Sequence, residues 1–312
     1  MVVVIVGAGA MGCRFGGALH KAGAEVWLYD VSELHVNSIK ERGLIVHDGE
    51  GVERLPLNAT TDIASVPPPD LAVIFTKAIH TKSALEQAVR CFTPDTAVLT
   101  MQNGLGSIEL ISQYTPQENI IAGITNYASD MLGPGEIEAK GSGISKVMPL
   151  SGKTAPMASG FVGMLNSVGC HAELTDNIMK DIWEKVAFNA ALNTITAITG
   201  LTVGGVGSTE EGFRLAKAVS SDVIRVAHAE GVEADGSHVH EVIESVFDPE
   251  MSGDHKTSML QDVAAKRRTE ADAICGVVLE KAFNHGLGVR YLETVYLLIK
   301  MIEHNYLKNP GN

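Results

Sequence analysis

Hydrophobic residues in the first half of the chain gather in short runs of valine, leucine and isoleucine, which alternate with amphipathic stretches. Such runs are typical of buried strands, and they cover residues 2–6, 25–29, 71–75, 97–101 and 120–124. The amphipathic stretches predict helices at residues 10–22, 32–42, 81–91 and 107–112. Alternation of strand and helix predicts an α/β domain with a mostly parallel, doubly wound sheet.

Two segments interrupt this alternation. Residues 44–46 and 52–57 predict short antiparallel strands around an Asp48-Gly49 turn. The Gly-Pro-Gly turn at residues 133–135 predicts the start of a β-meander that extends to about Met148.

The pattern of the second half is almost entirely helical. Helices are expected at residues 178–199, 209–230, 239–247, 257–285 and 291–306. Ser258 and Gln261 have the form of a capping box at the start of the fourth of these helices. The change in pattern predicts a dinucleotide-binding domain at residues 1–174 and an all-helical substrate and dimerisation domain at residues 175–312.

The first hydrophobic run leads directly into a glycine pattern, Gly7-x-Gly9-x-x-Gly12, with a helix after it. A strand, this glycine pattern and a helix together form the fingerprint of a Rossmann-type dinucleotide site. Gly7 allows the tight turn, Gly9 lets the backbone approach a pyrophosphate, and Gly12 lets the helix pack closely on the strand. Asp30 ends the second strand 18 residues after Gly12, close to the spacing of about 20 expected for an acid that binds a ribose.

Ligands of such sheets lie outside the carboxyl ends of the strands. By this rule, the residues that follow three further strands join those of the glycine loop as candidates for binding the cofactor. The candidate cofactor-binding residues are Gly7, Gly9, Ala10, Met11, Gly12, Asp30, Thr76, Lys77 and Asn103.

Composition narrows the class of protein. The chain has 312 residues, 45% hydrophobic and 20% charged, as expected for a globular protein of two domains. A net charge of −13 argues against non-specific binding of nucleic acid. The four cysteines show no metal-binding spacing and favour a reducing cytoplasm. We expect no metal, no signal peptide and no membrane span, because the N-terminus lacks a basic segment and no apolar run approaches 18 residues.

Three polar residues of the 178–199 segment fall on one face of the predicted helix. Lys185, Asn189 and Asn193 are spaced at i, i+4 and i+8 among apolar residues. The stripe either lines a polar cavity or faces solvent, and the spacing alone leaves both interpretations open. Glu270, taken in isolation, is typical of a surface residue.

The chain resembles the ketopantoate reductase family (2-dehydropantoate 2-reductases) over essentially its whole length. Besides Gly7-Ala8-Gly9-Ala10-Met11-Gly12, the resemblance is carried by Thr76-Lys77-Ala78, Gln102-Asn103-Gly104, Trp183-Glu184-Lys185-Val186-Ala187-Phe188-Asn189, Asn193, Ser258-Met259-Leu260-Gln261-Asp262 and Arg268-Thr269-Glu270 with Asp272. The resemblance implies an NAD(P)-dependent oxidoreductase that acts on the CH–OH group of 2-hydroxy acids.

The resemblance also implies roles for individual residues. Lys185 would be the general acid that protonates the ketone oxygen, and Glu270 would position substrate and lysine. Asn103, Asn189, Asn193 and Ser258 would line the substrate site, and Lys77 would lie near the cofactor.

Two departures from the family pattern favour one branch of the family. Many members carry a basic residue after the second strand to hold the 2′-phosphate of NADP, whereas this chain has Asp30, which favours NAD. Val203 stands where members commonly place an asparagine that meets the hydroxylated end of ketopantoate, and His255 occupies another position that is often asparagine. Val203 is therefore a further candidate substrate-binding residue. These departures resemble D-mandelate dehydrogenases of the family.

Three hypotheses follow. The first is a homodimeric, NAD-dependent D-2-hydroxy-acid dehydrogenase that reversibly converts C3-branched or aryl 2-oxo acids into (R)-2-hydroxy acids. The second is a 2-dehydropantoate 2-reductase that uses NADH. The third is a dinucleotide-sensing protein without catalysis, against which the pair of Lys185 and Glu270 argues.

Overall fold

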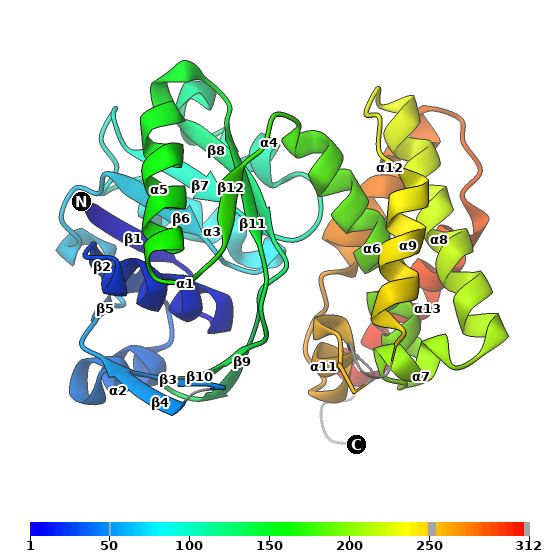
Figure 1. Ribbon diagram of the computed structural model, residues 1–312, viewed down its shortest axis with the longest axis horizontal. Coiled ribbons are helices and arrows are strands. Elements are labelled where there is room, and N and C mark those ends of the chain that lie inside the picture. Colours follow the sequence, from blue (N-terminus) through cyan, green and yellow to red (C-terminus); the bar gives the residue numbers. More distant parts are fainter. Residues whose placement is uncertain (50, 249–253, 309–312) are drawn as a thin grey trace. The chain divides into compact units, whose positions relative to one another are not determined.

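The computed structural model describes residues 1–49, 51–248 and 254–308 (Figure 1). The chain divides into two compact units. Unit 1 comprises Met1–Gln102 and Ser107–Ile178, and unit 2 comprises Asn103–Gly106 and Met179–Asn312. The short segment Asn103–Gly106 therefore belongs with the second half of the chain. The assignment of separate functions to residues 1–174 and 175–312 stays a prediction.

Unit 1 contains an eight-stranded sheet with the order β12-β11-β8-β7-β6-β1-β2-β5 (Figure 1). Its strands are β1 (Val2–Val6), β2 (Glu25–Tyr29), β5 (Asn58–Thr60), β6 (Leu71–Ile74), β7 (Ala97–Thr100), β8 (Ile120–Thr125), β11 (Ser145–Pro149) and β12 (Ala172–Leu174). The strands from β5 to β8 in this order are all parallel, and β11 is antiparallel to β8. The predicted doubly wound α/β domain is confirmed.

Alternate residues of β1 supply the two apolar layers of unit 1. Val3 and Ile5 pack in the core with helices α1 (Ala10–Lys21) and α5 (Ala155–Ser167). Val4 and Val6 pack on the other face with α3 (Ala78–Ala88) and α4 (Ser107–Ile111). Each of these four valine and isoleucine side chains is fully buried, which stabilises the fold by about 1.5–3 kcal/mol per side chain.

A second sheet of unit 1 has the order β4-β3-β10-β9. The predicted hairpin is confirmed as β3 (Leu44–Asp48) and β4 (Gly51–Leu55), which are antiparallel. The predicted meander is wrong. Strand β9 (Ala128–Gly133) pairs with β10 (Glu136–Lys140), but β10 then pairs with β3, while β11 returns to the large sheet. The partner of β10 lies about ninety residues earlier in the chain, so local turn residues did not reveal it.

Three further elements of unit 1, β5, α5 and β12, are absent from the sequence prediction. Gly160 and Gly163 lower the intrinsic helix propensity of α5. Burial of Ala158, Phe161 and Leu165 compensates for this, since these residues lie on one face of the helix.

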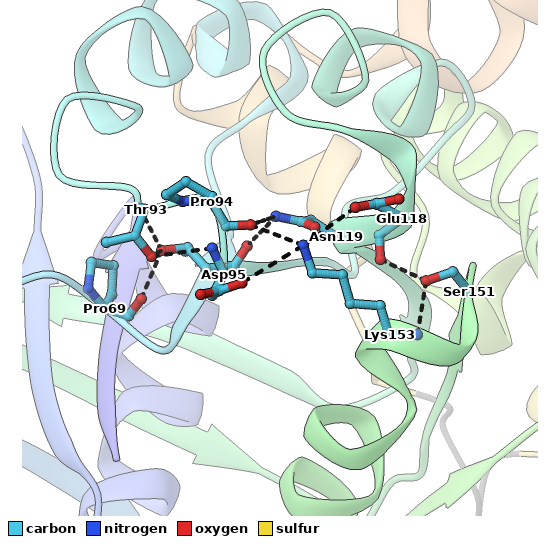
Figure 2. Close-up of polar contacts among 9 residues, drawn as sticks. Pro69, Thr93, Pro94, Asp95, Glu118, Asn119, Ser151 and Lys153 are labelled. Carbon is cyan, nitrogen blue, oxygen red and sulfur yellow. Dashed lines mark hydrogen bonds and ion pairs between the residues drawn. The ribbon is translucent and has the colours of Figure 1, made fainter.

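Side chains join the amino-terminal ends of the central strands (Figure 2). Asn119, which is 1% exposed, donates Nδ2 hydrogen bonds to the carbonyl oxygens of Pro94 at 2.8 Å and Thr96 at 3.1 Å. Lys153 donates to the Pro94 carbonyl at 3.0 Å and to the Glu118 carboxylate at 3.3 Å. These contacts lie at the edge opposite the carboxyl ends of the parallel strands, so we interpret them as structural.

The elements described in unit 2 are all helical. They are α6 (Ile178–Thr199), α7 (Val203–Gly207), α8 (Glu210–Ala229), α9 (Gly236–Val246), α11 (Ser258–Ala264), a π-helical segment (Asp272–Gly276), α12 (Val277–Asn284) and α13 (Arg290–Lys308). They pack around one apolar core that includes Trp183, Ile195 and Leu292. The predicted helical second half is confirmed, and no helix in the described ranges has the length and hydropathy needed to span a bilayer.

The single helix predicted at residues 257–285 is wrong. Helix α11 ends at Ala264, and Lys266 has a φ of 53°, the left-handed conformation that often follows a helix. The N–H and hydroxyl of Thr269 then donate to the Glu303 carboxylate on α13 at 2.7 and 2.6 Å. Tertiary hydrogen bonds thus replace the helical ones at this point.

The predicted capping box at the start of this segment is also displaced by one residue. The N-cap of α11 is Thr257, whose Oγ1 accepts a hydrogen bond from the Leu260 N–H at 3.3 Å. Ser258 is the first helical residue.

Candidate active site

The glycines after β1 each have a different environment. Gly7 has a φ of 95°, and a Cβ added there would lie 2.7 Å from the backbone nitrogen of Thr76. A Cβ on Gly12 would lie 2.1 Å from the carbonyl oxygen of Gly7. A Cβ on Gly9 would meet no heavy atom within 4 Å. The turn and the helix packing therefore need Gly7 and Gly12, whereas Gly9 borders open space.

That open space adjoins the start of α1. Gly9 is the N-cap residue and provides no side-chain hydrogen bond to the helix. The first N–H groups of a helix, here those of Ala10 and Met11, have no acceptor within the helix itself. Backbone donors and the positive end of the helix dipole suit the pyrophosphate of a dinucleotide. This loop fits the predicted cofactor.

Asp30 lies at the carboxyl end of β2, beside the glycine loop. The Gly7 N–H donates to the Tyr29 carbonyl at 2.9 Å, which holds the loop against the end of β2. The Asp30 side chain is partly exposed and accepts a hydrogen bond from the Ser32 N–H at 3.0 Å. Glu33 begins helix α2 (Glu33–Arg42). A phosphate group near these residues would meet carboxylates, whereas a ribose diol would find acceptors.

The carboxyl ends of β6 and β7 are joined by Gln102, a residue that the sequence analysis did not select as a site residue. Its Nε2 donates to the Thr76 carbonyl at 2.6 Å and to Thr81 Oγ1 at 2.7 Å. Lys77 is the N-cap residue of α3 and is partly buried. The position of Gln102 in the sequence could have indicated this role, because it lies two residues after the end of β7, at the ligand-binding edge of the sheet.

In unit 2, Lys185, Asn189 and Asn193 lie along α6. Asn189 is 8% exposed and Asn193 is 6% exposed, and Lys185 is partly buried. A solvated stripe would leave the asparagine side chains in water. Their burial therefore excludes the solvent-facing interpretation for Asn189 and Asn193.

Burial also changes the acidity of the lysine. Loss of hydration lowers the pKa of Lys185 to about 8, while the negative charge of Glu270 acts in the opposite direction and raises it. A lysine with this pKa is mostly protonated at pH 7 but releases its proton more readily than an exposed lysine.

The segment around Glu270 is not the surface helix that the pattern predicted. Glu270 lies two residues before the π-helical turn, and its carbonyl accepts hydrogen bonds from the N–H groups of Ala273 at 3.1 Å and Ile274 at 3.0 Å. Single π-helical turns occur frequently at functional sites.

Asn103 is held against the same π-helical turn by the residues that follow it. The Leu105 N–H donates to the Ala273 carbonyl at 3.0 Å. Gly104 has a φ of 88°, and a Cβ there would lie 2.4 Å from that carbonyl oxygen. The π-helical turn of unit 2 thereby holds the segments of both Asn103 and Glu270, which are far apart in the sequence.

The remaining candidates lie at the starts of α11 and α7. Ser258 is exposed, and the hydroxyls of Thr257 and Thr196 lie 2.7 Å apart, which ties α11 to α6. Val203 is 2% exposed within the apolar core, and its N–H donates to the His255 carbonyl at 3.0 Å. Val203 therefore has almost no surface of its own to offer a ligand, and its predicted role stays a prediction.

Within residues 1–49, 51–248 and 254–308, no group of three or more histidine, cysteine, aspartate or glutamate side chains is arranged to hold a metal ion.

Two family descriptions match the chain. Residues 3–152 match ketopantoate reductase PanE/ApbA, and residues 177–303 match the C-terminal part of the same family. A 2-dehydropantoate 2-reductase from Streptococcus pyogenes is 32% identical over 302 residues, which are 96% of this chain and 97% of that protein.

Solved structures agree with this assignment. A ternary structure of D-mandelate dehydrogenase with NADH and anilino(oxo)acetate has a TM-score of 0.94 and 32% identity, and the alignment covers 98% of this chain and 99% of that one. A ketopantoate reductase of the PanE/ApbA family from Ralstonia eutropha has a TM-score of 0.89 and 28% identity, with 98% and 100% covered. The chain is an oxidoreductase that belongs to the ketopantoate reductase family.

Proposed function

We propose that the protein is an NAD-dependent D-2-hydroxy-acid dehydrogenase that reversibly reduces C3-branched or aryl 2-oxo acids to (R)-2-hydroxy acids. The observation that carries this proposal is Lys185, a partly buried lysine with a pKa of about 8 that is influenced by Glu270 and shares its helix face with two buried asparagines. The similar D-mandelate dehydrogenase, which was solved with NADH and an aryl oxo acid anion, supports the choice of substrate class.

Residues of unit 1 would hold the cofactor. The N–H groups of Ala10 and Met11 would bind the pyrophosphate, with Gly9 giving access. Asp30 would accept hydrogen bonds from the hydroxyls of the adenosine ribose. Thr76 and Lys77 come after β6, which pairs with β1, and would also lie near the cofactor. Bound NADH supplies the hydride that adds to the substrate carbonyl carbon.

Residues of unit 2 would act on the substrate. Negative charge develops on the carbonyl oxygen as the carbonyl carbon is reduced. The Lys185 ammonium stabilises that charge and donates the proton that completes the hydroxyl group. Glu270 favours the protonated lysine before the reaction. Asn103, Asn189, Asn193 and Ser258 offer hydrogen-bond donors that orient the 2-oxo acid without adding charge.

A second candidate function is 2-dehydropantoate 2-reductase. The observation in its favour is that curated relatives at 32% identity carry this name. A dinucleotide-sensing protein without catalysis has less support, because Lys185 and Glu270 are both present and act on one another.

One assay distinguishes these functions. NADH oxidation is followed with benzoylformate, 2-oxoisovalerate and ketopantoate, and kcat/KM is compared. We expect benzoylformate or 2-oxoisovalerate to be the best substrate. Ketopantoate as the best of the three would favour the second function, and no turnover together with tight NADH binding would favour the sensor.

We also propose that the protein acts as a homodimer that associates through unit 2. Helix α13 presents apolar side chains at its surface, among them Leu297, which is 52% exposed, and Met301, which is 68% exposed. Sedimentation equilibrium distinguishes the 33.1 kDa monomer from a species of twice that mass. Residence in the cytoplasm stays a prediction from the use of cysteine.

A further inference from the structure

The residues on both sides of Glu270 are held by polar side chains of α13. On one side, the N–H and Oγ1 of Thr269 donate to Oε1 of Glu303 at 2.7 and 2.6 Å. On the other, the Tyr296 hydroxyl donates to Asp272 at 2.9 Å. Lys300 lies between the two acceptors, 2.8 Å from the Glu303 carboxylate and 3.0 Å from that of Asp272. We call these five residues the α13 clamp.

Burial of the polar groups of the α13 clamp costs free energy, which a contact between apolar side chains would not. Glu303 is 3% exposed and Thr269 is 2% exposed, so a carboxylate and its donors have been removed from water. Replacing all partners of such a buried polar network by apolar side chains of similar volume is often neutral or stabilising. A buried polar network does, however, specify one conformation, because each donor has few alternative acceptors.

Lys300 and Asp272 of the clamp each stabilise the charged form of the other. Burial opposes the charged form of Lys300, yet its bonds to Glu303 and Asp272 outweigh burial and raise the pKa of Lys300. Burial likewise opposes the ionised form of Asp272, yet the bonds from Lys300 and Tyr296 lower the pKa of that carboxyl. Lys300 and Asp272 therefore both stay ionised around neutral pH.

The backbone between the two attachment points has little freedom. Only Glu270 and Ala271 separate Thr269 from Asp272, and the Ala271 N–H donates to Thr269 Oγ1 at 3.2 Å. The Glu270 carbonyl is held by the first N–H groups of the π-helical turn. Holding the chain at Thr269 and Asp272 restricts the positions from which the Glu270 carboxylate can act on Lys185.

We infer that the α13 clamp positions Glu270 for the reaction, and that Thr269 and Glu303 are positioning residues without any contact to substrate or cofactor. This inference rests on the proposed function, in which Lys185 donates the proton. The same π-helical turn also binds the loop after Asn103, through the Leu105 N–H and the Ala273 carbonyl. The clamp thereby sets the place of a second predicted substrate-binding residue.

The expected consequence has a definite sign. Reduction needs the protonated lysine, so kcat for reduction falls as pH rises above about 8, the pKa of Lys185. Glu270 raises that pKa, so a Glu270 carboxylate that is removed or displaced must let it decrease. The decline of kcat then begins at a lower pH.

The test uses Thr269→Val, which keeps the shape of the side chain and loses the hydroxyl donor, and Glu303→Gln, which keeps an acceptor and loses the charge. We expect each variant to lower kcat roughly tenfold to 100-fold, the size of effect that misplacement of a reacting group produces. The pH profile should shift to lower pH, as it does in Glu270→Gln. NADH affinity, measured by fluorescence titration, should stay unchanged, and Thr269→Ser should restore kcat.

A double-mutant cycle separates positioning from a merely structural role. In a Glu270→Gln background, Thr269→Val should add almost nothing to the loss of kcat, because the group through which it acts is already gone. The matched control is Glu230→Gln, which removes another carboxylate of unit 2, bonded to Lys281 and His285. That variant should leave kcat and its pH profile at the original values.

Two different outcomes overturn two different claims. If Glu270→Gln leaves the pH profile of kcat unchanged, the proposed pairing of Lys185 with Glu270 is wrong. If Glu270→Gln shifts the profile while Thr269→Val and Glu303→Gln do not, or if their effects add fully to it, the clamp is structural and the inference is overturned.

Discussion

The two units assemble their predicted binding residues from different parts of the polypeptide. In unit 1, the loop from Gly7 to Gly12 offers backbone N–H groups, and its shape depends on the absence of side chains at two positions. In unit 2, the important groups are side chains on separate segments, with Lys185 on α6, Glu270 before the π-helical turn and Glu303 on α13. A backbone site is defined by six consecutive residues, whereas a side-chain site depends on contacts over much of the unit.

This difference predicts opposite sensitivities. At Gly7 and Gly12 of the glycine loop, one added methyl group meets backbone atoms that have no room to move. In unit 2, a polar side chain can be truncated without disturbing the helix that carries it, so activity should be lost before the fold is. Substitutions in each region can therefore separate loss of chemistry from loss of structure.

The largest effect is expected for Lys185→Ala. It should lower kcat by roughly 10²–10⁴, because it removes both the general acid and the charge that stabilises the oxyanion. NADH affinity, measured by fluorescence titration, should change little, since the candidate cofactor-binding residues other than Asn103 lie in unit 1. Lys180→Ala is the matched control on the same helix, where the Lys180 side chain is 40% exposed and forms an ion pair with Glu184 at 3.7 Å. Near-normal turnover of Lys185→Ala would refute the catalytic assignment.

The next effect separates two glycines that the sequence motif treats alike. Gly12→Ala places a Cβ 2.1 Å from the Gly7 carbonyl oxygen, and such overpacking should lower the free energy of unfolding by about 1–3 kcal/mol. Gly9→Ala meets open space within unit 1, so its melting temperature should stay close to the original. Its NADH affinity should nevertheless fall by about tenfold or more, equivalent to about 1.4 kcal/mol. Thermal melts and NADH titrations of both variants would show whether the two losses separate in this way.

The same difference explains which features could be predicted from the sequence and which could not. The glycine loop, the parallel strands and helix α6 were predicted from local patterns, because a turn residue, an apolar run or a 3.6-residue period contains the whole signal. The pairing of β10 with β3 and the break of the helix after Ala264 were not predicted, because each depends on a distant partner. The position of Glu270 could not be predicted for the same reason. It depends on the contact between Thr269 and Glu303, and Glu303 lies more than thirty residues away in the chain.

Cofactor choice should show a smaller effect, carried by one side chain of unit 1. The Asp30 carboxylate at the end of β2 should favour NADH over NADPH by tenfold or more in kcat/KM, because a lost hydrogen bond to a charged group is worth about 1.5–3 kcal/mol. Asp30→Asn removes the charge and keeps an acceptor, so the preference should narrow through better use of NADPH. Equal efficiency of the original protein with both cofactors would contradict this role.

The smallest effect is expected for Val203, and it concerns the preference between two substrates. The side chain is 2% exposed, so it can influence a ligand only through the packing of α7 and through its hydrogen bond to the His255 carbonyl. Val203→Asn should move the ratio of kcat/KM for ketopantoate and benzoylformate toward ketopantoate by a few-fold, well below the 10–200-fold that direct contact with one methylene can provide. Burying an amide without partners should at the same time lower the free energy of unfolding by about 1–3 kcal/mol. Val203→Thr is the matched control, since it keeps the branched shape. A ratio that changes in Val203→Asn beyond 200-fold would mean that residue 203 contacts the substrate directly, and an unchanged ratio with lowered stability would remove Val203 from the substrate site.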